Sequence, residues 1–96
     1  MSVRVRIPMA LRAYAGQCDE VEVPAATVDD ALARLAERYP QLGRHLLGDD
    51  GRVRSFVGVF LNDDDVRHLG GGGAAVSPGD VVTLVPSVAG GKGAGG

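Results

Sequence analysis

The stretch from residue 28 to residue 39 constrains the fold most, because its apolar residues recur at the spacing of an α-helix. They form one continuous stripe: Val28, Ala31, Leu32, Leu35, Ala36 and Tyr39. Thr27 precedes the stripe as a helix N-cap, and Asp29 and Asp30 suit the positive end of the helix dipole. Pro40 predicts that the helix stops near Tyr39. A helix with a single apolar face must bury that face against a second layer of structure.

Stretches with strand periodicity supply this second layer. Apolar residues alternate with polar ones, the pattern of a half-buried strand, in residues 3–7 and 20–23. Residues 53–61 and 80–85 are also predicted as strands, with apolar residues on both faces. Pro24 ends the second stretch, and residues 14–19 predict a turn that closes a hairpin between the first two. Residues 65–69 predict a short further strand, residues 70–73 a flexible glycine loop, and residues 42–47 one more helical turn.

This order of elements predicts an α+β fold, with a mixed sheet of four to five strands and one main helix packed on one face. The first and last strands both carry apolar positions on alternating faces, so we place them side by side in the middle of the sheet. That arrangement is the β-grasp, or ubiquitin-like, fold. Periodicity predicts the elements, whereas the strand order is an inference by analogy.

Length and composition limit the choice of function. Ninety-six residues suffice for a single domain, which we place at residues 1–86 with a flexible, glycine-rich tail at residues 87–96. The net charge of −2 gives no reason to expect a nucleic-acid or anionic-membrane partner, and no apolar run could span a bilayer. The single cysteine, Cys18, cannot form an internal disulfide. These features fit a cytoplasmic protein.

The body of the chain carries no convincing catalytic or metal-binding set. His45 and His68 lack the spacing of metal ligands. The run Asp63–Asp65 lacks the spaced ligands and the closing glutamate of a calcium loop, and a solvated turn explains it better. The glycines at 70–73 are not followed by the Lys-Ser/Thr of a phosphate loop. We therefore expect a protein that is not an enzyme and holds no bound cofactor or metal.

A partner-binding surface is predicted on the sheet. If alternate residues of the third strand face the helix, Phe56 and Phe60 face the opposite side, where Val81 and Val85 of the last strand are their neighbours. An uncovered apolar face of this kind suits the docking of another protein. The alternative is a one-residue slip of the strand, which would turn the phenylalanines into the core.

The end of the chain is unusual. Pro86 blocks further sheet pairing because it has no N–H, and residues 86–91 would reach roughly 20 Å beyond the sheet if extended. Gly90 and Gly91 lack a Cβ, so their backbone could thread a narrow channel and approach another enzyme's active site closely. The alternative is an ordinary frayed terminus.

Two segments together resemble a known family. "DVVTLVPSVAGG" follows "SPGD" and is preceded by "FVGVFLNDDDVR". This arrangement is similar to the ThiS/MoaD family of ubiquitin-like sulfur carriers, and within it to the cysteine-synthesis carriers of actinobacteria. The likeness covers residues 3–91, and its most specific parts are Leu61–Arg67 and Gly79–Gly91.

The resemblance implies a protein cosubstrate rather than a catalyst. A separate E1-like adenylating enzyme would use ATP to convert the terminal glycine to an acyl-adenylate, and a sulfur donor would then form a thiocarboxylate. The carrier would deliver this sulfur to a biosynthetic enzyme that makes cysteine, molybdopterin, thiamine or another sulfur-containing product. The resemblance also implies that the activating enzyme's channel holds the tail residues Val88, Ala89, Gly90 and Gly91, while Phe56, Phe60, Val81 and Val85 dock on its surface.

The chain departs from the family pattern by five residues, "KGAGG", after Gly91. A metalloprotease could trim them, Gly96 could itself be the activated end, or they could be an addition to the natural chain. We favour Gly91, because the segment Val85–Gly91 keeps the family spacing between sheet and carboxylate. Two other functions stay open: a ubiquitin-like modifier that joins a lysine of another protein, and a plain β-grasp binding module with an inert tail.

Overall fold

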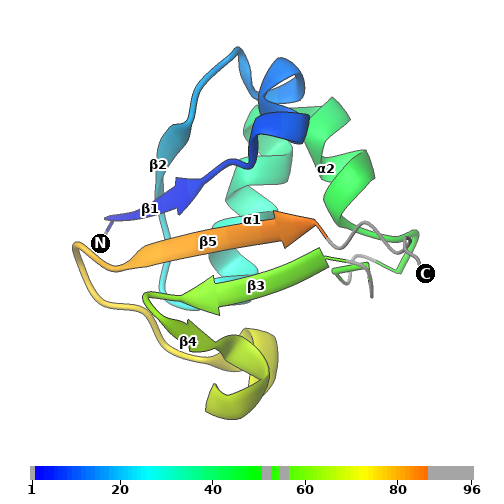
Figure 1. Cartoon of the computed structure of the whole chain (residues 1–96). Helices are drawn as coiled ribbons and strands as arrows, with labels where there is room; N and C mark the ends of the chain where they lie inside the picture. The colour runs from blue at the N-terminus through cyan, green and yellow to red at the C-terminus, as the bar shows by residue number, and fades with distance from the viewer. Residues whose placement is uncertain (1, 51–52, 55–56, 87–96) are drawn as a thin grey trace.

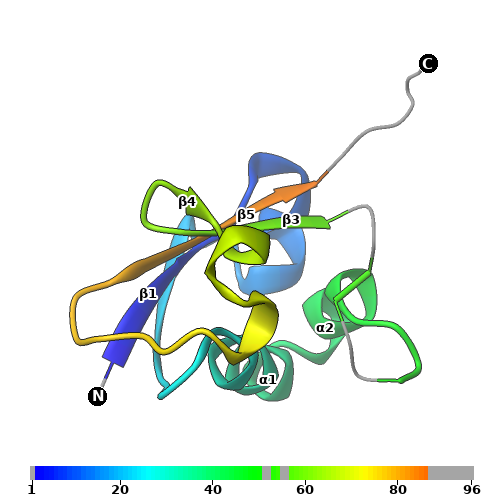
Figure 2. The ribbon, with the colours of Figure 1, turned by 90° about the horizontal axis from the view of Figure 1, so that it is seen from below.

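The computed structural model describes residues 2–50, 53–54 and 57–86, and in this part of the chain a mixed five-stranded sheet lies against helices (Figure 1). The strands are β1 Ser2–Arg6, β2 Glu20–Pro24, β3 Val57–Leu61, β4 Asp64–Asp65 and β5 Val81–Pro86. The α-helices are α1 Val28–Arg38 and α2 Pro40–Leu46, and three 3-10 segments are η1 Met9–Ala15, η2 Val66–Leu69 and η3 Gly71–Gly73. Figure 2 shows α1 and α2 on the same side of the sheet.

The strand order is β2-β1-β5-β3-β4, so the first and last strands do lie side by side in the middle. β1 and β5 are parallel, whereas β3 pairs antiparallel with both β5 and β4. A parallel pair at the centre requires a long crossover between its strands, and the amphipathic helix α1 belongs to that crossover. The predicted β-grasp arrangement is therefore confirmed.

The core lies between one face of the sheet and the apolar stripe of α1. Alternate residues of the three central strands are buried, and so is most of the predicted stripe. The fully or nearly fully buried residues in these elements are Val3, Val5, Val57, Val59, Leu61, Val82, Leu84, Val28, Ala31, Leu32 and Leu35. Since Val57, Val59 and Leu61 face the core, β3 has the predicted register, and a one-residue slip is excluded.

The ends of α1 follow from its flanking residues. The side chain of Thr27 accepts a hydrogen bond from the backbone N–H of Asp30 (3.1 Å), and the Asp30 carboxylate accepts one from the N–H of Ala26 (3.1 Å). This exchange satisfies two N–H groups at the start of the helix. Pro40, which would have broken α1, instead starts α2, because the first turn of a helix needs no N–H at that position.

Three connections differ from the sequence prediction. Residues 9–15 form η1 instead of leading straight into a hairpin turn, and Arg12 Nε fixes its start by donating to the carbonyl of Ile7 (3.1 Å). Residues 66–69, predicted as a strand, form η2 after a strand of only two residues, β4. The glycines predicted as a loop form η3, which the left-handed backbone of Gly70 (φ 95°) allows. Val53 and Arg54, predicted as the start of the third strand, lie outside β3, which is described over Val57–Leu61.

Candidate functional site

The central strand β5 is fixed from its first residue to its last. At its start, Val81 N–H donates to the side-chain oxygen of Asn62 (3.1 Å), and its carbonyl accepts from the Asn62 N–H (2.7 Å). Asn62 holds this position with a left-handed backbone, which asparagine tolerates better than most residues. At the other end, Pro86 is the register partner of Val57 on β3. Anything beyond Pro86 therefore starts from a firmly anchored point at one end of the sheet.

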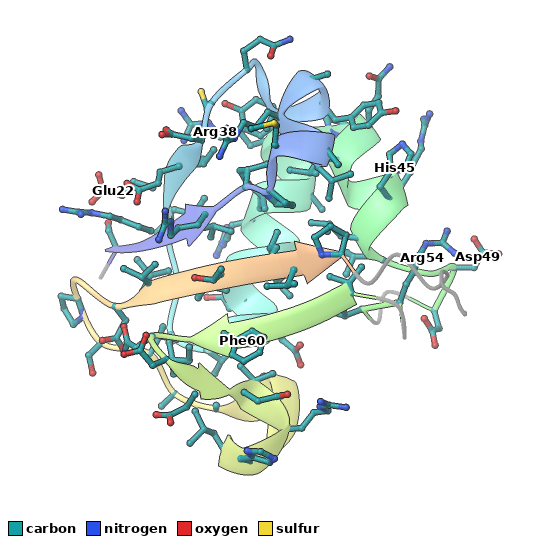
Figure 3. All side chains as sticks on the ribbon, in the orientation of Figure 1. Glu22, Arg38, His45, Asp49, Arg54 and Phe60 are labelled. Atoms are coloured by element: carbon teal, nitrogen blue, oxygen red, sulfur yellow. The ribbon has the colours of Figure 1, made fainter. Side chains whose placement is uncertain are left out.

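The outer face of the sheet carries an apolar patch over β5 and β3, composed of Gly58, Phe60, Val81 and Val85. Gly58 is paired with Val85, and Phe60 with Thr83, so these side chains share one face of the sheet. The Phe60 ring and the Val85 side chain approach Gly58 closely enough that a Cβ there would lie 3.7 Å and 3.8 Å from their nearest carbons. Val85 is 45% exposed, a large fraction for a valine in a central strand. Figure 3 shows Phe60 on this uncovered face.

The other half of the same face is charged. Arg4 and Arg6 of β1 are partners in register of Glu22 and Glu20 of β2, and all four side chains are exposed. Arg6 and Glu20 form a loose ion pair of 3.8 Å. The outer face thus divides into a charged half over β1 and β2 and an apolar half that leads to the end of β5.

Asp65 lies at the edge of the apolar patch, because it is the register partner of Phe60. Its carboxylate accepts hydrogen bonds from the backbone N–H of Arg67 (2.9 Å) and from the Arg67 guanidinium (2.7 Å from Nη2). These bonds favour the charged form and lower the pKa of Asp65 to about 2. The same contacts cap the start of η2.

We expect the stabilising effect of Asp65 to depend on pH. Its pKa is lower in the folded chain than the ordinary value of 3.8, so its contribution is present above about pH 4 and is lost as the pH falls toward 2. Asp65→Asn should therefore be less stable than the wild type at neutral pH, and the two should converge near pH 2. Urea unfolding at a series of pH values measures this difference. A gap that stayed constant from pH 6 to pH 2 would contradict the assigned role.

The predicted site residues divide into two groups. Phe60, Val81 and Val85 are brought to one face, as expected. Phe56, Val88, Ala89, Gly90, Gly91 and Gly96 lie outside the described residues. Sequence reasoning missed Asn62 as the anchor of β5, although its position at the turn after a buried strand was a usable signal.

The residues weighed for metal or catalytic roles are scattered. Within the described ranges no three His, Cys, Asp or Glu side chains gather in a way that could hold a metal ion. His45 stacks on the ring of Tyr14, with 4.2 Å between ring centroids. In the same part of the chain, no helix is both long and apolar enough to cross a membrane.

The chain has the fold of a ubiquitin-like β-grasp protein: a mixed five-stranded sheet with its first and last strands central and a helix across one face. Its last strand is followed in the sequence by Gly-Gly at residues 90–91. Comparison with known proteins assigns the family: the chain belongs to the ThiS family, whose model matches residues 5–91.

Individual relatives agree with this assignment. The sulfur carrier protein CysO of Mycobacterium tuberculosis (strain H37Rv) is 36% identical over 93 residues, which cover 95% of this chain and all of that protein. The CysO chain in a BexX/CysO complex of Amycolatopsis orientalis superposes with a TM-score of 0.83 at 36% identity, covering 92% of this chain and 98% of that one. Small archaeal modifier protein 3 of Haloferax volcanii is 42% identical over 66 residues, 69% of this chain and 71% of that protein.

Proposed function

We propose that this chain is a sulfur carrier that is adenylated and then thiocarboxylated at a C-terminal glycine, and that it donates this sulfur to a biosynthetic enzyme. The observation that supports the proposal best is the extent of the family match, which runs through the anchored strand β5 to residue 91, the second glycine of the first Gly-Gly. The similarity to proteins named CysO favours the cysteine-synthesis branch inferred from the sequence.

The chemistry explains why the folded body needs no catalytic residues. A carboxylate is a poor electrophile, so one of its oxygens first attacks the α-phosphate of ATP, and pyrophosphate leaves. Hydrosulfide then attacks the acyl carbon, the bond to the AMP oxygen breaks, and a thiocarboxylate, a proton and AMP result. The adenylating enzyme supplies the catalytic groups and binds ATP, while the carrier contributes a backbone carboxylate on a narrow chain.

Gly91 is the reactive residue in this proposal. From Pro86 to Gly91 an extended chain reaches about 17 Å, and the last five residues would add about as much again. A channel built for the shorter tail would hold the wrong atoms if residues 92–96 were still present. We therefore propose trimming by a metalloprotease before activation, with activation at Gly96 as the alternative.

Intact-protein mass spectrometry tests the function directly. The chain ending at Gly91 is incubated with the adenylating enzyme, ATP and sulfide, and we expect the mass change of one oxygen replaced by one sulfur. A parallel reaction without ATP serves as the control. If neither the form ending at Gly91 nor the form ending at Gly96 changes mass, the proposal fails.

A protein modifier is the second candidate, and the similarity to small archaeal modifier protein 3 favours it. The same acyl-adenylate would then react with a lysine amine of a target protein and form an isopeptide bond. Tryptic peptides from a cell lysate in which a lysine carries residues 68–91 would identify this reaction, because Arg67 is the last trypsin site before Gly91. If such peptides are absent and the thiocarboxylate is observed, the sulfur carrier is the only one of the two functions that remains.

The apolar patch is the proposed docking surface for the adenylating enzyme. Val85→Asp places a charge in the middle of this patch and should raise the KM for the carrier about 30-fold, the effect of losing a contact worth about 2 kcal/mol. Ala33→Asp puts the same charge on the solvent face of α1 and should leave the KM near the wild-type value. Steady-state pyrophosphate release measures both variants, and equal KM values would remove the patch from the interface.

A further inference from the structure

A shallow hollow lies on the helical side of the chain, between the end of α1, α2 and the segment that follows α2. Its volume is about 340 Å³. Its apolar lining comes from Ala36, Pro40, Gly43 and Leu47, and Gly48, Asp49, Arg44 and Arg54 complete the wall. Such a hollow suits an apolar side chain of a partner, with polar groups at its rim to orient it.

The hollow is next to the place where β5 ends. Val57, the register partner of Pro86, donates its N–H to the carbonyl of Arg54 (3.0 Å), and Arg54 donates its own N–H to the carbonyl of Leu46 at the end of α2 (2.8 Å). These two bonds tie the hollow to the end of the sheet from which the chain continues toward Gly91. In Figure 3, Arg54 and Asp49 lie beyond that end of β3 and β5.

The charge of the hollow is unbalanced toward the positive. Arg54 Nε donates to the backbone carbonyl of Arg44 (3.2 Å), and both arginines line the same hollow. Both are exposed, and within the described ranges neither forms an ion pair with a carboxylate. Asp49 is the lone carboxylate in the lining. At the opposite end of β3 the exposed side chains include the carboxylates of Asp63 and Asp64, so the two ends of the strand differ in charge.

We infer that this hollow binds an acidic loop of the adenylating enzyme, an Asp or Glu beside an apolar side chain, at the mouth of the channel that receives the tail; this inference rests on the proposed function. Guanidinium groups bind carboxylates in pairs of parallel hydrogen bonds, which orient as well as attract. Carboxylates at the mouth of the channel would attract the end of β3 near Arg44 and Arg54 and would repel the end near Asp63 and Asp64. The carrier would therefore approach with its tail toward the channel.

The test compares two charge reversals of equal size in the full chain. Arg44→Glu/Arg54→Glu reverses the charge of the hollow, and Arg34→Glu/Arg38→Glu reverses two exposed arginines of α1 that are not part of its lining. Isothermal titration calorimetry with the adenylating enzyme, at low and high salt, should show about a tenfold or greater loss of affinity and a flatter salt dependence for the first variant only. Arg44→Lys/Arg54→Lys keeps the positive charge but loses the paired N–H donors of the guanidinium groups. Its affinity should lie between those of the wild type and the charge reversal. Circular dichroism checks that each variant is folded.

The outcomes separate this inference from the proposed function. If the wild type is thiocarboxylated and both reversals bind as it does, or lose affinity equally, the inference fails and the function stands. If only binding to the sulfur-accepting enzyme is lost, the assignment of the occupant fails. If the wild type neither binds the adenylating enzyme nor gains sulfur, both proposals fail.

Discussion

Removing residues 90–96 should abolish the proposed thiocarboxylation, whereas removing residues 92–96 should preserve or accelerate it. The first deletion takes away the glycines that could enter a narrow channel. It also shortens the reach of an extended tail by about 7 Å relative to a chain that ends at Gly91. The second deletion exposes Gly91 as the end of the chain without changing the folded domain. The measurement is intact-mass analysis of each form after reaction with the adenylating enzyme, ATP and sulfide.

Adding a side chain at the last residue of the tail tests whether the C-terminus is the reactive group. In the chain ending at residue 91, Gly91→Ala adds a Cβ on the Cα next to the reacting carboxyl carbon and should slow adenylation on the order of 10²-fold, since small misplacements at a reacting centre have effects of this size. The docking affinity of the body should be unchanged. Full activity of the form lacking residues 90–96 in cells would instead support a binding module with an inert tail. Activity of the untrimmed chain alone would move the reactive position to Gly96.

The extent of successful prediction reflects how local each signal is. Helix α1 could be predicted because its apolar stripe, its N-cap Thr27 and the stop at Pro40 all lie within one continuous segment, residues 27–40. The faces of β3 and β5 follow from period two, so Phe60, Val81 and Val85 could be assigned to one surface. The strand order could not be read this way, because pairing between the first and last strands depends on the whole fold.

The missed features depend on individual contacts that leave no repeating pattern in the sequence. Segments η1, η2 and η3 are short 3-10 turns, and their stability comes from individual contacts such as that of Arg12 with the carbonyl of Ile7. Arg44 and Arg54 are ten residues apart in sequence. They meet only because the chain doubles back after α2, through the bridge between Leu47 and Val53. No pattern in the sequence marks that bridge, so the hollow could be found only in the structure.

Gly43→Val should destabilise the domain by about 3 kcal/mol, at the upper end of the usual cost of overpacking a core. Gly43 is buried where α2 crosses α1, and a Cβ there would lie 2.7 Å from the Cβ of Ala36 and 3.2 Å from its Cα. The latter is a backbone atom, so α1 itself would have to shift. Thermal unfolding should show a fall in Tm of roughly 12–24 °C. Gly58→Val is the matched control: its Cβ meets neighbours at ordinary distances of 3.4–3.8 Å at a half-buried position of β3, and its effect should stay within about 1 kcal/mol.

Exchanging residues 36 and 43 tests whether overlap with Ala36 causes the destabilisation expected for a side chain at residue 43. Gly43→Ala alone should cost about 1–2 kcal/mol, because the better helix propensity of alanine offsets part of the overlap. Ala36→Gly alone should cost about 1 kcal/mol through lost helix propensity. In the double variant the methyl group sits on the opposite helix and the closest overlap, with the Cβ of residue 36, is gone, while the 3.2 Å approach to its Cα remains, so the measured loss should be smaller than the sum of the two single losses. Strict additivity would mean that the helices are not held at this distance by Gly43. The hollow beside Arg44, which the same glycine lines, would then not depend on the close approach of α1 and α2.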